Sequence, residues 1–320
     1  MNFRVQRYIR ILFICMLAIG GITVAMYYQK QVQQDTITCN VPMLFDEYKK
    51  PVPALQSLLK IFSISADAQL NDIVTATQNS WLRKPGKERW EMENIYTPEI
   101  QTTLLNCCER LGMINEIKPA QKHYKYAVVL GATVQRVRTR VLYVLNLINQ
   151  GYTFEYVVLL GGQRPLDPSI ESTEILYNND KNFIIKAGWN KPATAPGTET
   201  DMMKMVVDQI AWPDNFNAPF IFVDAPLKNM PDGKVLRPTT GDTFATWLST
   251  KPEASSTLVV SHQPYIGYQD MVARTYLPQD FICHSCGAHC PEDEIVDSVL
   301  LDTLARWIYQ TREYYKKQTA

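Results

Sequence analysis

The chain has 320 residues, and its hydrophobic (46%) and charged (20%) fractions are ordinary for a globular protein. The 32 basic and 32 acidic residues give a net charge of zero, so no nucleic-acid partner is expected, because such a partner requires a basic surface. There is no internal repeat of solenoid period, and the length predicts one large domain or two modest ones.

The first 28 residues differ in composition from the rest of the chain. Arg4, Arg7 and Arg10 precede an uncharged run at 11–28. This run is long enough to cross a hydrocarbon layer of ~30 Å at about 1.5 Å per residue. The basic flank places the N-terminus in the cytoplasm and the bulk of the chain on the exported side of a bacterial inner membrane. We therefore expect a single-pass signal anchor at 1–28; a cleaved signal peptide is the alternative and gives the same compartment.

Two segments separate this anchor from the first apolar strand. Residues 29–53 are polar and include three prolines, so we expect a tether. Residues 54–123 have helical spacing, interrupted at Lys84-Pro-Gly86, and predict a small helical region.

Residues 124–278 alternate between apolar runs and segments with helical spacing. The apolar runs, which are typical of buried strands, lie at 126–132, 156–162, 220–223 and 258–260. The helical segments are expected between the first two runs and at 198–211, 242–249 and 266–276. This alternation predicts an α/β fold with a Rossmann-like parallel sheet and helices on both faces. Such sheets bind ligands beyond the carboxyl ends of their strands.

Several short motifs follow one another in 124–278. They are Val129-Leu-Gly131, Arg140, Gly161-Gly162, Thr198-Glu199, Thr240 with Asp242, and the strand that ends at Ser261. Their order resembles the SanA/ElyC/YdcF-like family of bacterial envelope proteins. Arg89-Trp-Glu91 and Gly162-Gln-Arg-Pro-Leu-Asp167 are similar to the longer, membrane-anchored members. The resemblance implies a Rossmann-like fold, an envelope role and a nucleoside-type ligand.

Two positions depart from the pattern of that family. Thr243 stands where an asparagine is common, and 261–269 has no arginine to complete a His-x-x-Arg pair. The departures put in doubt any role that this pair would carry.

The glycines that end the first two strands mark a candidate binding edge. Gly131 with Ala132, and Gly161-Gly162, can bring backbone amides close to an anion, and plain turn geometry is the alternative. No Gly-x-Gly-x-x-Gly fingerprint of dinucleotide binding is present. Arg140 and Arg164 follow near the same edge, and the planar guanidinium suits phosphate. We therefore expect an anionic small-molecule ligand.

Three side chains at this edge are candidates for catalysis. Glu199 and Asp242 each open a helix and could act as general bases, although both lie in capping-box patterns and helix capping is the alternative. His262 is a candidate acid/base or ligand contact, or else a structural histidine. Thr240 and Ser261 complete the predicted binding set.

Residues 279–320 hold a cysteine–histidine cluster and a helix expected at 298–317. The cluster, which matches half or more of a tetrahedral zinc site, consists of Cys283, Cys286, His289 and Cys290. An exported protein favours disulfides instead. We expect a structural role for the cluster outside the α/β core, with a disulfide favoured over zinc. The sequence identifies no cofactor.

These patterns together predict a membrane-anchored envelope protein that binds a phosphorylated or nucleoside-like small molecule. Hydrolysis or group transfer on an envelope precursor is the first hypothesis. A non-catalytic ligand-binding or envelope-integrity module is the alternative.

Overall fold

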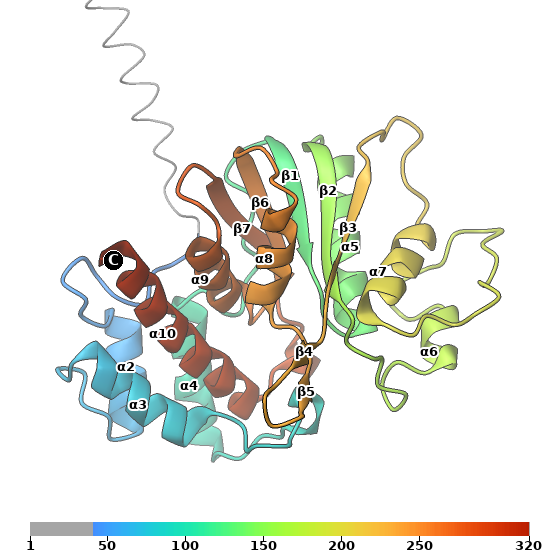
Figure 1. Ribbon diagram of the computed structural model, residues 1–320. Coiled ribbons are helices and arrows are strands. Elements are labelled where there is room, and N and C mark those ends of the chain that lie inside the picture. Colours follow the sequence, from blue (N-terminus) through green and yellow to red (C-terminus); the bar gives the residue numbers. More distant parts are fainter. Residues whose placement is uncertain (1–40, 320) are drawn as a thin grey trace, which may run out of the picture. The chain divides into compact units, whose positions relative to one another are not determined.

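The computed structural model describes residues 41–319 (Figure 1). The signal anchor expected at 1–28 lies outside these residues. Among the helices of 41–319, none combines the length and the apolar character that a membrane crossing requires.

Five parallel strands form the central sheet in the order β3-β2-β1-β6-β7. Their bounds are β1 His123–Leu130, β2 Thr153–Gly162, β3 Phe220–Ala225, β6 Ser256–His262 and β7 Ile282–Ala288. The chain builds the sheet outward from β1 to β3 and then returns to the other side of β1, which is the doubly wound arrangement. The order reverses between β1 and β6. Their carboxyl ends therefore flank the position at which such sheets bind ligands.

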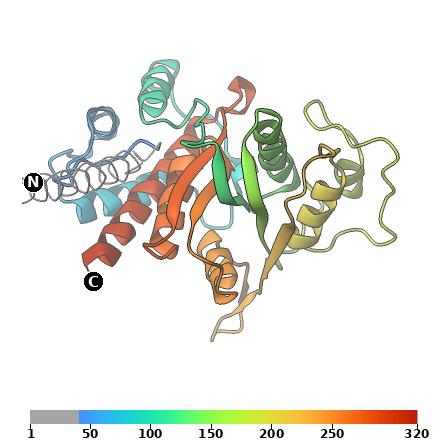
Figure 2. The same cartoon turned by 90° about the horizontal axis from the view of Figure 1, so that it is seen from above.

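Helices cover both faces of this sheet, which confirms the predicted Rossmann-like α/β fold. They are α5 (Val134–Asn149) and α7 (Glu199–Asp208) on one face, and α8 (Thr240–Ser249) and α9 (Ile266–Tyr276) on the other. Figure 2 shows α5 in green and α8 in orange on opposite sides of the strands. Along β1, Ala127 and Val129 face the α5 side, whereas Val128 and Leu130 face the α8 side. Because both faces are buried, the strands read as continuous apolar runs.

Three helices precede the sheet: α2 (Pro53–Ile61), α3 (Leu70–Trp81) and α4 (Pro98–Arg110). Of these, α3 and α4 pack against the last helix of the chain, α10 (Asp297–Thr319), and α2 packs against α4 (Figure 1). On α10, the fully buried Asp302 accepts hydrogen bonds from the Arg83 backbone and from the side chains of Arg89 and Arg306. These contacts join the region before β1 to the end of the chain.

The cysteine–histidine cluster lies inside the α/β core, so the prediction that it lies outside was wrong. Residues 282–288 form β7, the edge strand beside β6. Strand alternation places Cys283 and Cys286 on opposite faces of the sheet, each in a different apolar core, so the two cannot bond to each other. Cys286 and Cys290 are thiols. No three candidate metal ligands gather anywhere in residues 41–319.

Three short elements lie in the loops that follow β2 and β3. α6 (Thr173–Tyr177) lies in the long segment 163–197, and β4 (Lys228–Asn229) pairs with β5 (Val235–Leu236). Figure 1 places the β4–β5 hairpin below α8, on the side where β3 ends. Both loops therefore belong to the carboxyl edge of the sheet, where the ligand site is expected.

We expect Gly287→Ala to weaken the pairing of β6 and β7. A Cβ atom at Gly287 would lie 2.2 Å from the carbonyl oxygen of Ser261, its partner on β6. That oxygen belongs to the backbone, so it cannot move without disturbing the strand pair. The free energy of unfolding in urea should fall by about 1–3 kcal/mol, the usual cost of overpacking.

Gly197→Ala is the matched control for this substitution, because a Cβ atom there would meet no atom within 4 Å. Its free energy of unfolding should change by less than about 0.5 kcal/mol. Equal stability of the two variants would contradict the close approach of β7 to β6.

Candidate functional site

Arg140 is buried at the point where the sheet order reverses. Its helix starts directly after β1, and the side chain turns back toward that strand, where Nη1 donates to the carbonyls of Leu130 (2.7 Å) and Gly131 (2.8 Å). Its Nε donates to Nδ1 of His262, at the end of β6, at 3.0 Å. One guanidinium therefore bridges the carboxyl ends of the two strands that flank the expected ligand position.

The charge of Arg140 is only partly offset by its neighbours. All of its hydrogen-bond acceptors are uncharged: two backbone carbonyls, the imidazole of His262 and the side-chain amide of Gln269. Gln269 Oε1 is the most distant of them, at 3.5 Å. Burial lowers the pKa of Arg140 to about 9, and the negative charge of Glu199 opposes that shift. A buried cation of this kind favours an anion nearby.

His262 is held as a neutral ring with one unused donor. Because a guanidinium can only donate, Nδ1 of His262 accepts from Arg140 and the ring proton lies on Nε2. Burial and then the charge of Arg140 hold the pKa of His262 well below its usual value. Nε2 is buried and has no hydrogen-bond partner among residues 41–319. Since buried donors are nearly always paired, Nε2 is a candidate donor to a ligand.

Glu199 opens α7 and places its carboxyl group against Gly131. A Cβ atom at Gly131 would lie 2.8 Å from Cδ of Glu199, so this close approach requires glycine. Burial raises the pKa of Glu199 to about 7; the charge of Glu171 acts in the same direction, and Arg164 and Arg140 act against it. The side chain is 12% exposed. Glu199 can therefore give and take a proton near neutral pH.

Four of the five N–H groups of Arg164 donate hydrogen bonds, and the fifth, on Nε, faces Glu199. Nη1 donates to Glu171 (2.8 Å) and the Pro165 carbonyl (3.2 Å), and Nη2 donates to Glu171 (3.1 Å) and the Ala132 carbonyl (3.1 Å). Nε lies 3.6 Å from Oε1 of Glu199. Burial acts to lower the pKa of Arg164, but the hydrogen bonds and charges of Glu171 and Glu199 together outweigh it, and the pKa is raised. The expected phosphate contact therefore finds no free donor on this side chain.

Glu171 is a site residue that the sequence did not reveal. Its buried carboxylate accepts from the backbone amide of Val134 (3.1 Å), at the start of α5, where the Thr133 side chain makes no capping bond. The residue lies in the long segment after β2, which carries several acidic residues in no periodic pattern. No local signal distinguishes Glu171 from these other acids.

The predicted glycines serve close packing rather than a nest of free amides. The Gly131 amide donates to a β2 carbonyl at 2.9 Å. A Cβ atom at Gly161 would lie 2.6 Å from Thr200, and one at Gly162 would lie 2.4 Å from Pro238. These residues let the start of α7 and the loop before α8 approach β2.

Asp242 and Thr240 lie at the start of α8, and their hydrogen bonds and ion pairs involve other residues than Arg140 and Glu199. Asp242 forms a capping box with Thr239, and its Oδ2 lies 2.6 Å from Nζ of Lys228. Partial burial opposes ionisation of Asp242, but the hydrogen bonds from Lys228 and Thr239 outweigh it and lower the pKa. Thr240 is in the first turn of α8, where its carbonyl accepts from Thr243. Helix capping and Lys228 hold the carboxylate of Asp242, and its convergence with Glu199 stays a prediction.

Ser261 is fully enclosed at the end of β6. Its hydroxyl donates to the side-chain oxygen of Gln269 on α9, which also accepts from Arg140. Ser261 therefore links a strand to a helix beside the site.

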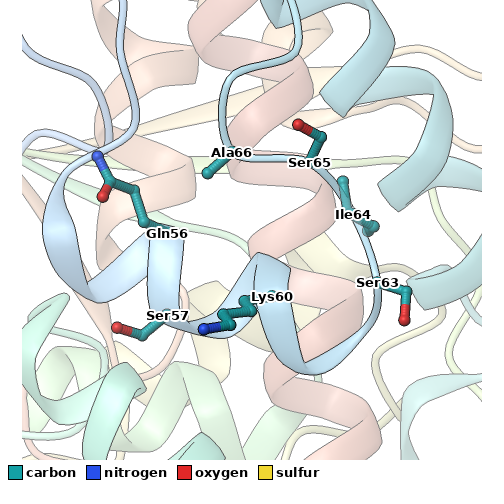
Figure 3. A pocket seen from close by; sticks show the side chains of 7 residues that line it. All are labelled: Gln56, Ser57, Lys60, Ser63, Ile64, Ser65 and Ala66. Carbon is teal, nitrogen blue, oxygen red and sulfur yellow. The ribbon is translucent and has the colours of Figure 1, made fainter.

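A surface hollow of about 480 Å³ lies beside α2 and contains none of the predicted site residues (Figure 3). It is lined by Gln56, Ser57, Lys60, Ser63, Ile64, Ser65 and Ala66. These side chains include one cation and no acid, so they offer no acid–base pair comparable to the one at the sheet edge.

No protein-family model, no curated protein and no solved structure matches this chain. Its function must therefore be argued from the geometry of its own residues.

We expect Glu199→Gln to remove a pH dependence of stability. The folded pKa of about 7 exceeds the ordinary value of 4.5, so the folded protein keeps a proton that the unfolded chain releases between these values. The stability from this proton is present below the unfolded pKa and is lost as the pH rises through the folded pKa. Glu199→Gln cannot ionise, so at about pH 8 it should exceed the wild type by up to about 3 kcal/mol.

Urea denaturation at a series of pH values checks this expectation. His262, whose lowered pKa acts with the opposite sign at acid pH, is common to both proteins and cancels in their difference. Glu174→Gln, a change of an exposed carboxyl, is the control. Parallel pH profiles for wild type and Glu199→Gln would show that Glu199 is not a raised-pKa carboxyl.

Proposed function

We propose that this protein binds an anionic small molecule, phosphorylated or nucleoside-like, at the carboxyl edge between β1 and β6. The observation that carries the proposal is the carboxyl group of Glu199, which has a pKa of about 7 and lies against Gly131 within the field of Arg140. In this role Glu199 takes a proton from a water or a hydroxyl group. The reaction class is hydrolysis or group transfer, for which a placed base supplies ~10²–10⁴ in rate.

The anionic character of the ligand is supported by the charges around His262. The positive charges of Arg140, Arg136 and Arg89 all act on the pKa of this ring. Arg136 and Arg89 have side chains that are 33% and 31% exposed, so they can meet a ligand from solvent, although each also pairs with a carboxylate. Among these three arginines, Nε2 of the neutral His262 ring supplies an uncharged hydrogen-bond donor.

A non-catalytic binding module is the alternative, and one observation favours it. Of the two predicted carboxyl groups, Asp242 is paired with Lys228 and caps α8, so Glu199 alone of this pair is placed for proton transfer. A non-catalytic module would require only the arginines, to bind the anion. An enzyme would also require Glu199, to accept a proton.

Membrane anchoring, export and membership of the SanA/ElyC/YdcF-like family are part of the same proposal. Anchoring is supported by the three arginines ahead of the uncharged run at 11–28. The cysteines lend export no support, because Cys107, Cys108, Cys286 and Cys290 are buried thiols, which pack as small apolar side chains.

Calorimetry and a phosphate-release assay on the full-length protein test the proposal, with inorganic phosphate, pyrophosphate and a nucleoside diphosphate as probes. At least one probe should bind, and Glu199→Gln should keep that binding while its release of phosphate falls by ~10²–10⁴. His262→Phe should weaken binding by about tenfold, because one hydrogen bond to the ligand is lost.

Asp242→Asn is the control, because Asp242 caps α8 and should leave binding and release unchanged. Binding without release by the wild type would favour the non-catalytic module. Failure of every probe to bind would contradict the proposed ligand class.

A further inference from the structure

Glu171 brings a fixed negative charge into the site from the segment that follows β2. Its side chain is fully enclosed, and its oxygens receive Nη1 of Arg164 at 2.8 Å and Nη2 at 3.1 Å. They also accept hydrogen bonds from the backbone amides of Val134 (3.1 Å) and Asp167 (3.0 Å). Four hydrogen bonds therefore hold this carboxylate in one position.

This pairing determines how Arg164 meets Glu199. With both Nη atoms engaged by Glu171 and by carbonyl groups, only Nε faces Glu199, at 3.6 Å. That distance is longer than the ~2.7–2.9 Å of a charge-assisted hydrogen bond. A guanidinium without this restraint could turn its two-pronged face to Glu199 and hold it ionised.

Within residues 41–319, three charged groups act most strongly on Glu199. Arg164 and Glu171 come from the segment after β2, and Arg140 comes from α5. Gly131, which directly follows β1 and lies against the carboxyl group, brings no charge. Glu171 is the only one of the three that acts against ionisation of Glu199.

We propose that Glu171 is a positioning residue, which neutralises Arg164 and holds both of its Nη atoms away from Glu199, so that Glu199 stays free to exchange a proton. This role rests on the proposed function of Glu199 as a base. It assigns to the long segment 163–197 a part in the chemistry at the sheet edge, although Glu171 itself need not touch a ligand.

The ionisation midpoint of Glu199 tests this role directly. It can be followed by NMR in the full-length protein with isotope-labelled glutamate carboxyls, titrated from about pH 4 to 9. Loss of one resonance in Glu199→Gln assigns the signal. Glu171→Gln keeps the shape and an acceptor but removes the charge, so the midpoint should fall by about one unit or more. Glu171→Asp keeps the charge and should restore most of the wild-type midpoint.

Glu174→Gln, an exposed carboxyl of the same segment, is the control and should not move the midpoint. An unchanged or raised midpoint in Glu171→Gln would overturn the proposal, and so would an equal fall in Glu174→Gln or in Glu171→Asp. Should Glu171→Gln not fold, Arg164→Gln gives the converse measurement, because removal of the cation should raise the midpoint and a fall would overturn the proposal. No ligand is added, so an unmoved midpoint is distinct from a failure of the phosphate probes to bind.

Discussion

The buried guanidinium of Arg140 is the interaction on which the site depends. It satisfies two carbonyls at the end of β1 and one imidazole nitrogen at the end of β6, so it fixes the separation of these strands where the sheet order reverses. The same donor fixes the tautomer of His262 and leaves its other nitrogen unpaired. The positive charge of Arg140 also makes a nearby anion favourable, and the carboxyl group of Glu199, at the start of α7, supplies that negative charge when it is ionised.

Two cations and two carboxyl groups alternate along this edge, in the order Arg140, Glu199, Arg164 and Glu171. The net charge of the four is zero when Glu199 is ionised and positive when it holds its proton. The proposed anionic ligand would therefore bind more strongly when Glu199 is protonated, and its binding would raise the pKa of Glu199 by linkage.

The sequence predicts the sheet well because strands buried on both faces need continuous apolar runs, and four of the five strands have them. β7 was not predicted, because its Cys-His-Ser-Cys-Gly run has the form of a ligand set and Ile282 is its only branched side chain. Glu199 and Asp242 both lie in capping-box patterns, Glu199 at the first helical position and Asp242 at the third, so the patterns alone do not separate a base from a cap. Burial separates them, and burial depends on the whole fold. Glu171 could not be found, because its partners are set by the path of an irregular segment.

The contact between the helices before β1 and the final helix α10 has a consequence for biosynthesis. The apolar side of α3, with Ile73, Val74 and Trp81, packs against an element that begins only at Asp297. A growing chain must therefore carry this surface unpaired until its last residues are made. If the chain is also translocated from its N-terminal end, those helices reach the far compartment first and remain without their partner for most of the passage, exposed to holding chaperones and proteases there.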